Sequence, residues 1–182
     1  AGNAHGNPGN YFYPYEGDWP IPSTGLNAKW NVFSDGEPGE YLTDRLTTEA
    51  VKFIRENRER PFFLYFPHYG DHTPLQGKPE MVAKYDKIRK AKRQGKPAYA
   101  AMVESIDDSV GRIVETLHEL NLDDNTVVIF TSDNGGFFGA TTNAPLRANK
   151  GAYYEGGIRV PLIIKWPQVA MPNSLCSEPV IT

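Results

Sequence analysis

TVVIFTSDNGGFFGATTNAPLRANKGAYYEGGIRVPLIIKWP, residues 126–167, carries the strongest structural signals in this chain of 182 residues. It opens on β-branched and aromatic residues, 126–131, and such an uninterrupted run predicts a buried strand. Asp133 and Asn134 follow, and Gly135 and Gly136 come next. Because ligands of open α/β sheets bind at the carboxyl ends of strands, this turn is a candidate site for a hard cation or an anionic substrate.

The side chains of Asp133 and Asn134 offer oxygen atoms and no soft donor. Carboxylate and amide oxygens suit Ca²⁺ or Mg²⁺ and do not favour zinc. Asp-Asn-Gly is also a common turn sequence after a strand, so a purely structural turn stays open on these residues alone.

The order of short motifs across this stretch resembles the sulfatase family, within the alkaline-phosphatase-like group of metal-dependent hydrolases. The motifs are Ser-Asp-Asn-Gly at 132–135, Lys-Gly at 150–151 and Tyr-Glu-Gly-Gly-Ile-Arg-Val-Pro at 154–161. Each motif is weak by itself, whereas the ordered set at close spacing is specific. The resemblance implies hydrolysis of sulfate esters, with a sulfated small molecule or glycan as the substrate.

The resemblance also implies roles for four side chains. Asp133 and Asn134 would bind one divalent cation, usually Ca²⁺ with Mg²⁺ as the alternative, which polarises sulfate oxygens. Lys150 would place its charge on a sulfate oxygen or near the leaving group. His72, separated from Pro74 by one residue, matches a family histidine that would contact the sulfate ester or its leaving-group oxygen. The structural alternatives are a surface lysine and a loop histidine.

Two pairs of charged residues are assigned structural roles. Glu155 and Arg159 are four residues apart and are expected to form an ion pair that shapes the loop. Asp107 and Asp108 are neighbours on a predicted helix, where adjacent side chains point about 100° apart and cannot converge on one atom. We therefore interpret both aspartates as structural or surface groups.

Alternation of helices and strands predicts an α/β domain with a mixed, largely parallel sheet flanked by helices, and the resemblance implies the alkaline-phosphatase-like version. Residues 1–40, rich in Gly, Pro and aromatics, are interpreted as a loop region with short strands, and residues 41–182 as the α/β core. Together, residues 1–182 are expected to be the central to C-terminal part of a sulfatase catalytic domain, incomplete at both ends.

Three elements of the predicted core have clear boundaries. A helix starts at Tyr41, with Thr43 or Asp44 as its cap, and ends before Pro61; an apolar strand follows at 62–66. A longer helix begins near Pro97. Its apolar stripe, expected to pack on the sheet, contains Met102, Val103, Ile106, Val110, Ile113, Val114, Leu117 and Leu120.

The family nucleophile, a formylglycine made from Cys or Ser in Cys/Ser-x-Pro-x-Arg, has no matching sequence here. The single cysteine, Cys176, is followed by a proline one place too late and by no arginine. The family's early paired aspartates and its Gly-Lys-Trp-His segment are also absent. We therefore expect the formylglycine to lie in a missing N-terminal part. We also expect that activity requires the remainder of the catalytic domain and that this chain alone does not turn over substrate.

Composition excludes some classes of partner. A formal net charge of −3 gives no general electrostatic reason to bind nucleic acid or an acidic membrane. No apolar run approaches the roughly 20 residues of a membrane-spanning helix, and no signal peptide is recognisable. The chain itself does not define a compartment, whereas the resemblance implies a periplasmic, secreted or lysosomal location.

Two other functions remain open on the sequence. A phosphodiesterase or phosphonate hydrolase of the same broad group would use a similar strand-end site but would need further His and Asp ligands. A non-catalytic carbohydrate-binding domain is supported mainly by the aromatic residues of the first 40 positions.

Overall fold

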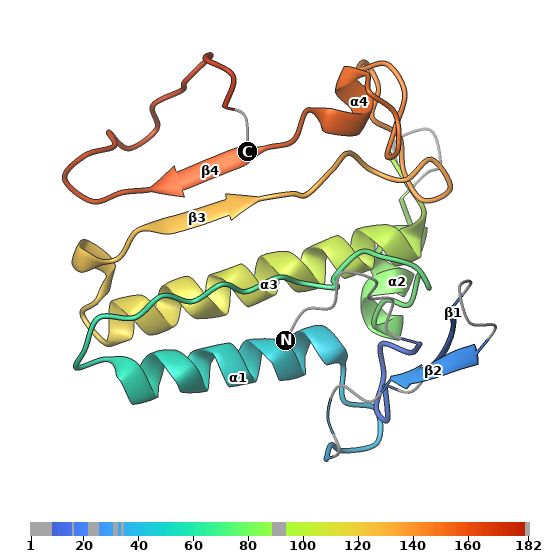
Figure 1. Cartoon of the computed structure of the whole chain (residues 1–182), viewed down its shortest axis with the longest axis horizontal. Coiled ribbons are helices and arrows are strands. Elements are labelled where there is room, and N and C mark those ends of the chain that lie inside the picture. Colours follow the sequence, from blue (N-terminus) through green and yellow to red (C-terminus); the bar gives the residue numbers. More distant parts are fainter. Residues whose placement is uncertain are drawn as a thin grey trace.

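The computed structural model describes residues 9–15, 17–21, 26–30, 33, 35–88 and 94–180. Two long helices, α1 (Leu42–Asn57) and α3 (Pro97–Glu119), lie side by side at the centre, and α2 (Pro79–Asp86) packs on α3 (Figure 1). A 3₁₀ turn, η2 (Asp123–Asn125), leads into β3 (Val128–Thr131). The chain continues through the short helix α4 (Glu155–Ile158) to β4 (Leu162–Lys165).

Two features of α1 follow from its sequence, and one prediction about it was wrong. The helix begins at Leu42, directly after Tyr41, and its last residue lies shortly before Pro61. Thr43 and Asp44 lie inside the first turn, and no side-chain hydrogen bond caps the helix. Thr43 is instead buried, because the start of α1 packs into the core and leaves no room for an exposed cap.

Helix α3 begins with Pro97 in its first turn, as predicted. Its buried residues include Ser105 and Ser109, and the Thr47 hydroxyl of α1 lies 2.6 Å from Ser109 Oγ. Val103 and Val114 from the predicted apolar stripe are 41% and 37% exposed. Ser109 therefore faces α1, Ser105 contacts Met81 of α2, and part of the predicted stripe lies outside the buried face.

The described residues form two antiparallel sheets of two strands each. β1 (Gly17–Ile21) pairs with β2 (Leu26–Trp30), and β3 pairs with β4 in a register that sets Val128 opposite Lys165. The largely parallel sheet remains a prediction. Residues 62–66 are not in a strand, although they run in the same direction as β3 in Figure 1.

Burial of β3 was predicted wrongly. Ile129 is 62% exposed, and Phe63 and Tyr65 in the 62–66 segment are 87% and 77% exposed. All four residues of β4 are exposed as well. A strand is buried on both faces only when neighbouring strands and covering layers enclose it, and β3 has β4 as its one strand partner among the described residues.

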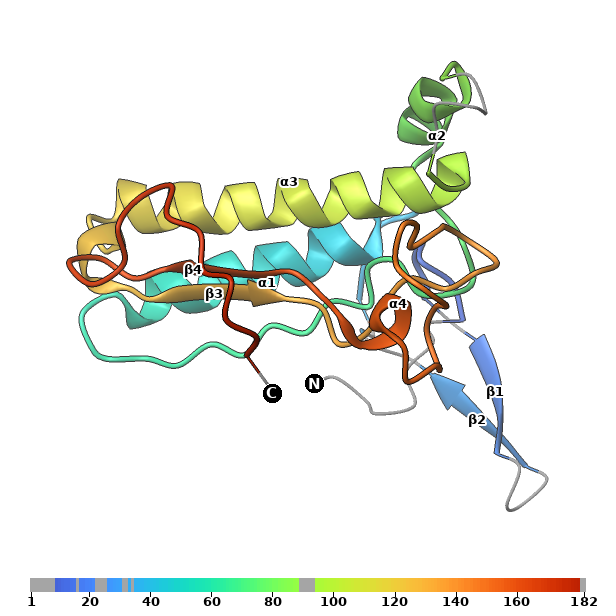
Figure 2. The ribbon, with the colours of Figure 1, turned by 90° about the horizontal axis from the view of Figure 1, so that it is seen from above.

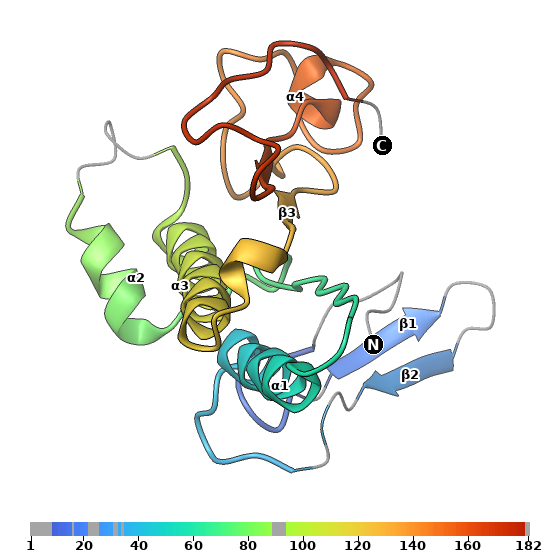
Figure 3. The same cartoon turned by 90° about the vertical axis from the view of Figure 1, so that its left-hand side faces the viewer.

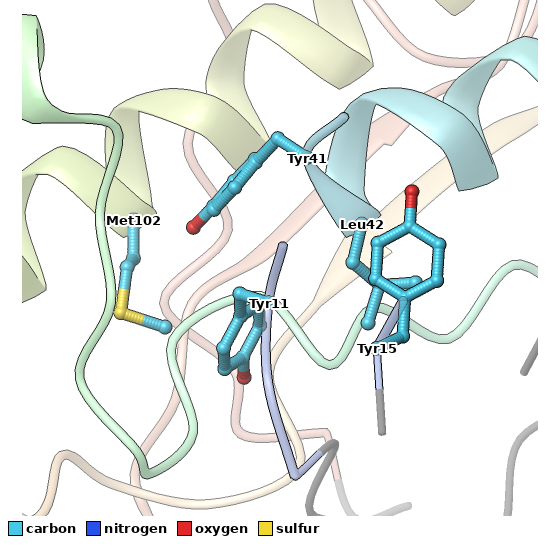
Figure 4. Close-up of a cluster of buried hydrophobic side chains, with 5 residues drawn as sticks. All are labelled: Tyr11, Tyr15, Tyr41, Leu42 and Met102. Carbon is cyan, nitrogen blue, oxygen red and sulfur yellow. The ribbon is translucent and has the colours of Figure 1, made fainter. Parts of the chain in front are cut away.

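The largest buried hydrophobic cluster joins the N-terminal segment to the helices. It contains Tyr11, Tyr15, Tyr41, Leu42 and Met102 (Figure 4). Tyr11 and Tyr15 of the aromatic N-terminal segment therefore pack in the core. The side chains of Trp19 and Trp30, from the same segment, lie outside the described residues. Within the described chain, no helix has the length and apolar character needed to cross a membrane.

Candidate functional site

The turn after β3 presents Asp133 and Asn134 with free oxygen atoms. Ser132 Oγ donates a hydrogen bond to the main-chain oxygen of Asn134 at 3.0 Å, and Asn134 Nδ2 donates to Asp133 Oδ1 at 2.8 Å. Asp133 Oδ2 and Asn134 Oδ1 have no hydrogen bond from any described residue. The local bonding therefore aligns a carboxylate and an amide side by side and leaves one oxygen of each available.

Glycines allow the turn after β3 to contact α4 through the main chain. Gly135 N donates to Gly157 O at 2.9 Å, and a Cβ at Gly135 would collide with the carbonyl oxygen of Gly156. Gly156 N in turn donates to Arg147 O at 2.8 Å, and a Cβ at Gly156 would lie 2.6 Å from that oxygen. Side chains at these positions would separate the two segments, so the Gly-Gly pairs fix the approach of the loops.

Lys150 is attached to the same turn. Its main-chain N–H donates to Gly136 O at 3.2 Å. The Asn143 side chain completes the junction, because Asn143 Oδ1 accepts from Gly136 N and Asn143 Nδ2 donates to Gly136 O, both at 2.9 Å. The structure thus brings the lysine loop against the Asp133–Asn134 turn, and the Lys150 side chain is exposed. The sequence did not identify Asn143 as a site residue, because an asparagine within a loop is common and has no distinctive pattern.

Charged and aromatic side chains stabilise the loop that carries Lys150. The Arg147 guanidinium carbon lies 3.7 Å from the centre of the Tyr154 ring, which is a cation–π distance. Arg159 and Glu155 form the predicted ion pair, with 3.6 Å between Arg159 Nη1 and Glu155 Oε1. Both of these side chains are exposed, so the pair shapes the loop with a small contribution to stability.

His72 lies in a tight turn on α3. Its N–H donates to Tyr69 O at 3.0 Å, and its Nδ1 lies 3.2 Å from Thr73 O. Thr73 Oγ1 lies 3.3 Å from the same Nδ1, so the tautomer decides which Thr73 oxygen is bonded, and Nε2 has no hydrogen-bond partner among the described residues. Neighbouring residues anchor the turn: Tyr99 Oη donates to Asp71 Oδ2 at 3.1 Å, and Gly70 lies against Ile106.

The two parts of the candidate site lie at one end of α3. Lys96, just before the helix, donates to Ala140 O at 2.8 Å, so the loop after β3 is tied to the start of α3. The turn of His72 is tied to the first half of the same helix, and α4 lies toward that end of the helix in Figure 2 but is set apart from α3 in Figure 3. No hydrogen bond or ion pair joins His72 to Asp133, Asn134 or Lys150, all of which are described residues.

The donor set at this turn fits a hard cation but does not complete its coordination. No cluster of three or more His, Cys, Asp or Glu side chains occurs in the part of the chain that the structure describes. Asp133 and Asn134 supply oxygen ligands, whereas Ca²⁺ takes about 6–8 oxygens. A cation here would need oxygen ligands beyond these two side chains.

His68 is a second histidine near the site, with a structural environment. Its ring lies 4.3 Å from that of Phe66, and its Nε2 is 3.3 Å from Ser109 Oγ. Its Nδ1 is buried without a hydrogen-bond partner among the described residues. Burial lowers the pKa of His68 to about 4, so its imidazole is neutral near pH 7.

Comparison with known proteins identifies similar sequences over most of the chain. The family model "Sulfatase" matches residues 2–177. A sulfatase of Formosa agariphila is 44% identical over 161 residues, which cover 82% of this chain and 28% of the relative. Mouse steryl-sulfatase is 37% identical over 153 residues, covering 78% of this chain and 23% of the relative. The chain therefore spans about a quarter of the length of these curated relatives.

Solved structures also resemble the chain. The crystal structure of Ps i-CgsB in complex with k-i-k-neocarrahexaose superposes with a TM-score of 0.66 at 40% sequence identity. The match covers 77% of this chain and 31% of that protein. The arrangement of helices and loops described above is therefore shared with a solved protein that binds an oligosaccharide.

Proposed function

Because this chain belongs to the sulfatase family, we propose that it is part of an enzyme that hydrolyses sulfate esters on a sulfated carbohydrate. The observation that carries the proposal is the junction of the Asp133–Asn134 turn with the loop of Lys150. Main-chain hydrogen bonds and glycine contacts attach an ammonium-bearing loop to a turn with free hard oxygens. Such a junction suits a tetrahedral anion bound next to a cation.

Asp133 Oδ2 and Asn134 Oδ1 are the atoms we assign to a divalent cation, Ca²⁺ or alternatively Mg²⁺. When bound, the cation would supply positive charge to the sulfate oxygens. Lys150 contributes a compact positive charge. Among the described residues, it forms no ion pair with Asp133. The nucleophile, expected to be a formylglycine, and the remaining cation ligands belong in this proposal to residues outside this chain.

His72 is the proton donor in this proposal. Its Nδ1 lies within hydrogen-bonding distance of both Thr73 oxygens, which leaves Nε2 free to hold a proton for the departing alcohol oxygen. An imidazole suits this task because its charge changes near physiological pH. The position of its turn at the same end of α3 as the loop of Lys150 supports the assignment.

A glycan substrate is favoured over a sterol. Ps i-CgsB, crystallised with a neocarrahexaose, is 40% identical, whereas mouse steryl-sulfatase is 37% identical. The exposed aromatic side chains around the lysine loop, Phe138 at 77% and Tyr153 at 96%, offer ring faces on which a sugar can stack. The same family likeness supports a periplasmic, secreted or lysosomal location.

The test uses the intact protein that contains this chain. Turnover is measured on an aryl sulfate, the matching aryl phosphate and a set of sulfated oligosaccharides, with and without a chelator. We expect sulfate turnover that a chelator removes, and a higher kcat/KM on sulfated oligosaccharides than on the aryl sulfate. A preference for the phosphate would indicate a phosphoryl-transfer relative, and glycan binding without any turnover would indicate a carbohydrate-binding domain.

A further inference from the structure

We propose that Tyr11 is a positioning residue for His72, because its hydroxyl holds together the turn that carries the histidine. The inference rests on the proposed role of His72 and adds a residue from the N-terminal segment to the site. Tyr11 and His72 are 61 residues apart in sequence. The aromatic segment that opens the described chain would thus support the chemistry as well as the core.

The Tyr11 hydroxyl lies between the two main-chain carbonyls of the turn. Tyr11 Oη is 2.8 Å from Tyr69 O and 2.9 Å from His72 O. The N–H of His72 donates to the same Tyr69 oxygen at 3.0 Å. One phenolic proton is therefore shared by the first and last carbonyls of the turn. Among the described residues, the Tyr11 hydroxyl is the hydrogen-bond donor to His72 O.

Tyr11 is itself fixed on several sides. Its side chain is fully buried, and its ring stacks on that of Tyr41 with 6.0 Å between the ring centres. Tyr11 N donates to Gln76 Oε1 and Tyr41 Oη donates to Gln76 O, both at 2.8 Å. Leu42 N donates to Tyr11 O at 2.8 Å. The hydroxyl is thus held by α1 and by the segment after His72, and it does not move independently of them.

The chemistry of the hydroxyl fits a permanent donor. Burial raises the pKa of Tyr11 well above its usual range, so the phenol keeps its proton at any physiological pH. Without the hydroxyl, His72 O would be left unsatisfied in a part-buried position, and the turn would open toward water. Because a misplacement of about 1 Å can slow an enzyme about 100-fold, loosening this turn should reduce turnover.

Tyr15 provides a matched control. It belongs to the same buried cluster, and its hydroxyl makes no hydrogen bond to the turn of His72. The hydroxyls of Tyr11 and Tyr15 point in opposite directions in Figure 4. Tyr11→Phe and Tyr15→Phe therefore remove the same atom from the same cluster, and only the first removes a bond to the turn.

The first test is hydrogen exchange of main-chain amides in the intact protein. In Tyr11→Phe we expect the His72 amide to exchange at least about tenfold faster, with the amides of α1 and α3 unchanged. Tyr15→Phe should leave the His72 amide unchanged. Unchanged exchange at His72 in a folded Tyr11→Phe protein would overturn the proposal, and so would an equal increase in both variants.

The second test is a double-mutant cycle in turnover. Tyr11→Phe should lower kcat about tenfold with little change in KM, and should have no further effect when combined with His72→Ala. Tyr11→4-aminophenylalanine, which keeps an N–H donor, should restore most of the loss and remains informative if the phenylalanine variant does not fold. An equal loss in the His72→Ala background would overturn the proposal. If His72→Ala itself left kcat unchanged, the proposed role of His72 as proton donor would be wrong, while hydrogen exchange would still decide whether Tyr11 positions the turn.

Discussion

The main-chain N–H of Lys150 donates a hydrogen bond to the carbonyl oxygen of Gly136 at 3.2 Å. This bond ties the lysine loop to the turn that carries Asp133 and Asn134, and it involves no side-chain atom of Lys150. The relative position of the two loop segments is therefore set largely by the backbone. The side chains of Lys150 and Asp133 can be removed singly without breaking this bond, which makes their roles separable.

Lys150→Ala should slow sulfate transfer by the intact enzyme while leaving the cation bound. Loss of one charged contact to a developing anion typically lowers kcat about 10²–10³-fold. Steady-state kinetics and elemental analysis of the purified protein measure the two effects. Lys52→Ala, on the exposed side of α1, is the matched control and should be silent. A cation lost together with Lys150 would contradict the separate roles.

Asp133→Ala should reduce cation retention, because it removes the one carboxylate at the turn after β3. The metal content after dialysis should fall, and excess Ca²⁺ should restore part of the activity. Asp107 is an exposed aspartate on α3, so Asp107→Ala is the control and should keep its metal content. Full metal content in Asp133→Ala would remove this residue from the coordination set.

Gly156→Ala should destabilise the junction between α4 and the lysine loop. The added Cβ would collide with the carbonyl oxygen of Ala148 and lie 2.6 Å from that of Arg147. We expect a loss of about 1–3 kcal/mol in the free energy of unfolding, as for overpacking elsewhere. Gly111→Ala in α3 has no atom within 4 Å of its Cβ and should be neutral or stabilising by up to about 1 kcal/mol. Urea denaturation of both variants checks the difference, and equal midpoints would refute it.

Stability should fall as the pH drops below about 6.5 because of His68. Its pKa in the folded state is about 4, below the ordinary 6.5, because burial disfavours the charged ring. Between these pH values the unfolded chain binds a proton at His68 that the folded chain does not. The contribution of the neutral His68 to the free energy of unfolding is therefore fully present above pH 6.5 and declines toward pH 4. The loss is about 3 kcal/mol, since one pKa unit corresponds to about 1.4 kcal/mol.

Urea denaturation at pH 7 and pH 5 measures this effect. His68→Gln, which does not titrate, should show a smaller difference between the two pH values than the parent protein. His118→Gln is the comparison at a histidine whose ring is 79% exposed, and it should not reduce the loss of stability that is assigned to His68. If the parent protein lost no more stability between pH 7 and pH 5 than His68→Gln, another group would control the loss of stability at low pH.

Local sequence signals predicted several elements well. Pro97 marked the start of α3 because a proline is tolerated in the first helical turn. The spacing of Glu155 and Arg159 gave their ion pair, and Asp107 and Asp108 are exposed on the helix surface. Each of these outcomes depends on neighbours within one or two helical turns, which is the range that a sequence pattern reports.

Other features depend on contacts between distant segments and were missed. Met102 and Leu117 of the predicted stripe are buried, whereas the Thr47–Ser109 contact between α1 and α3 had no signal in the apolar periodicity. Thr43 looked like a helix cap but is buried by tertiary packing. The hydrogen bonds of Asn143 to Gly136 and of Tyr11 to the turn of His72 produce no periodic pattern in the sequence, because each depends on the polar atoms of one side chain.

The exposed β3–β4 ribbon has a practical consequence for any polypeptide limited to residues 1–182. Ile129 and Ile163 are each 62% exposed on paired strands, and Phe63 and Leu175 add uncovered apolar surface. Two copies that met along this ribbon could shield one another's side chains by stacking or edge-to-edge pairing. Such a polypeptide should self-associate at the millimolar concentrations of solution spectroscopy, with light scattering rising before any heat-induced transition.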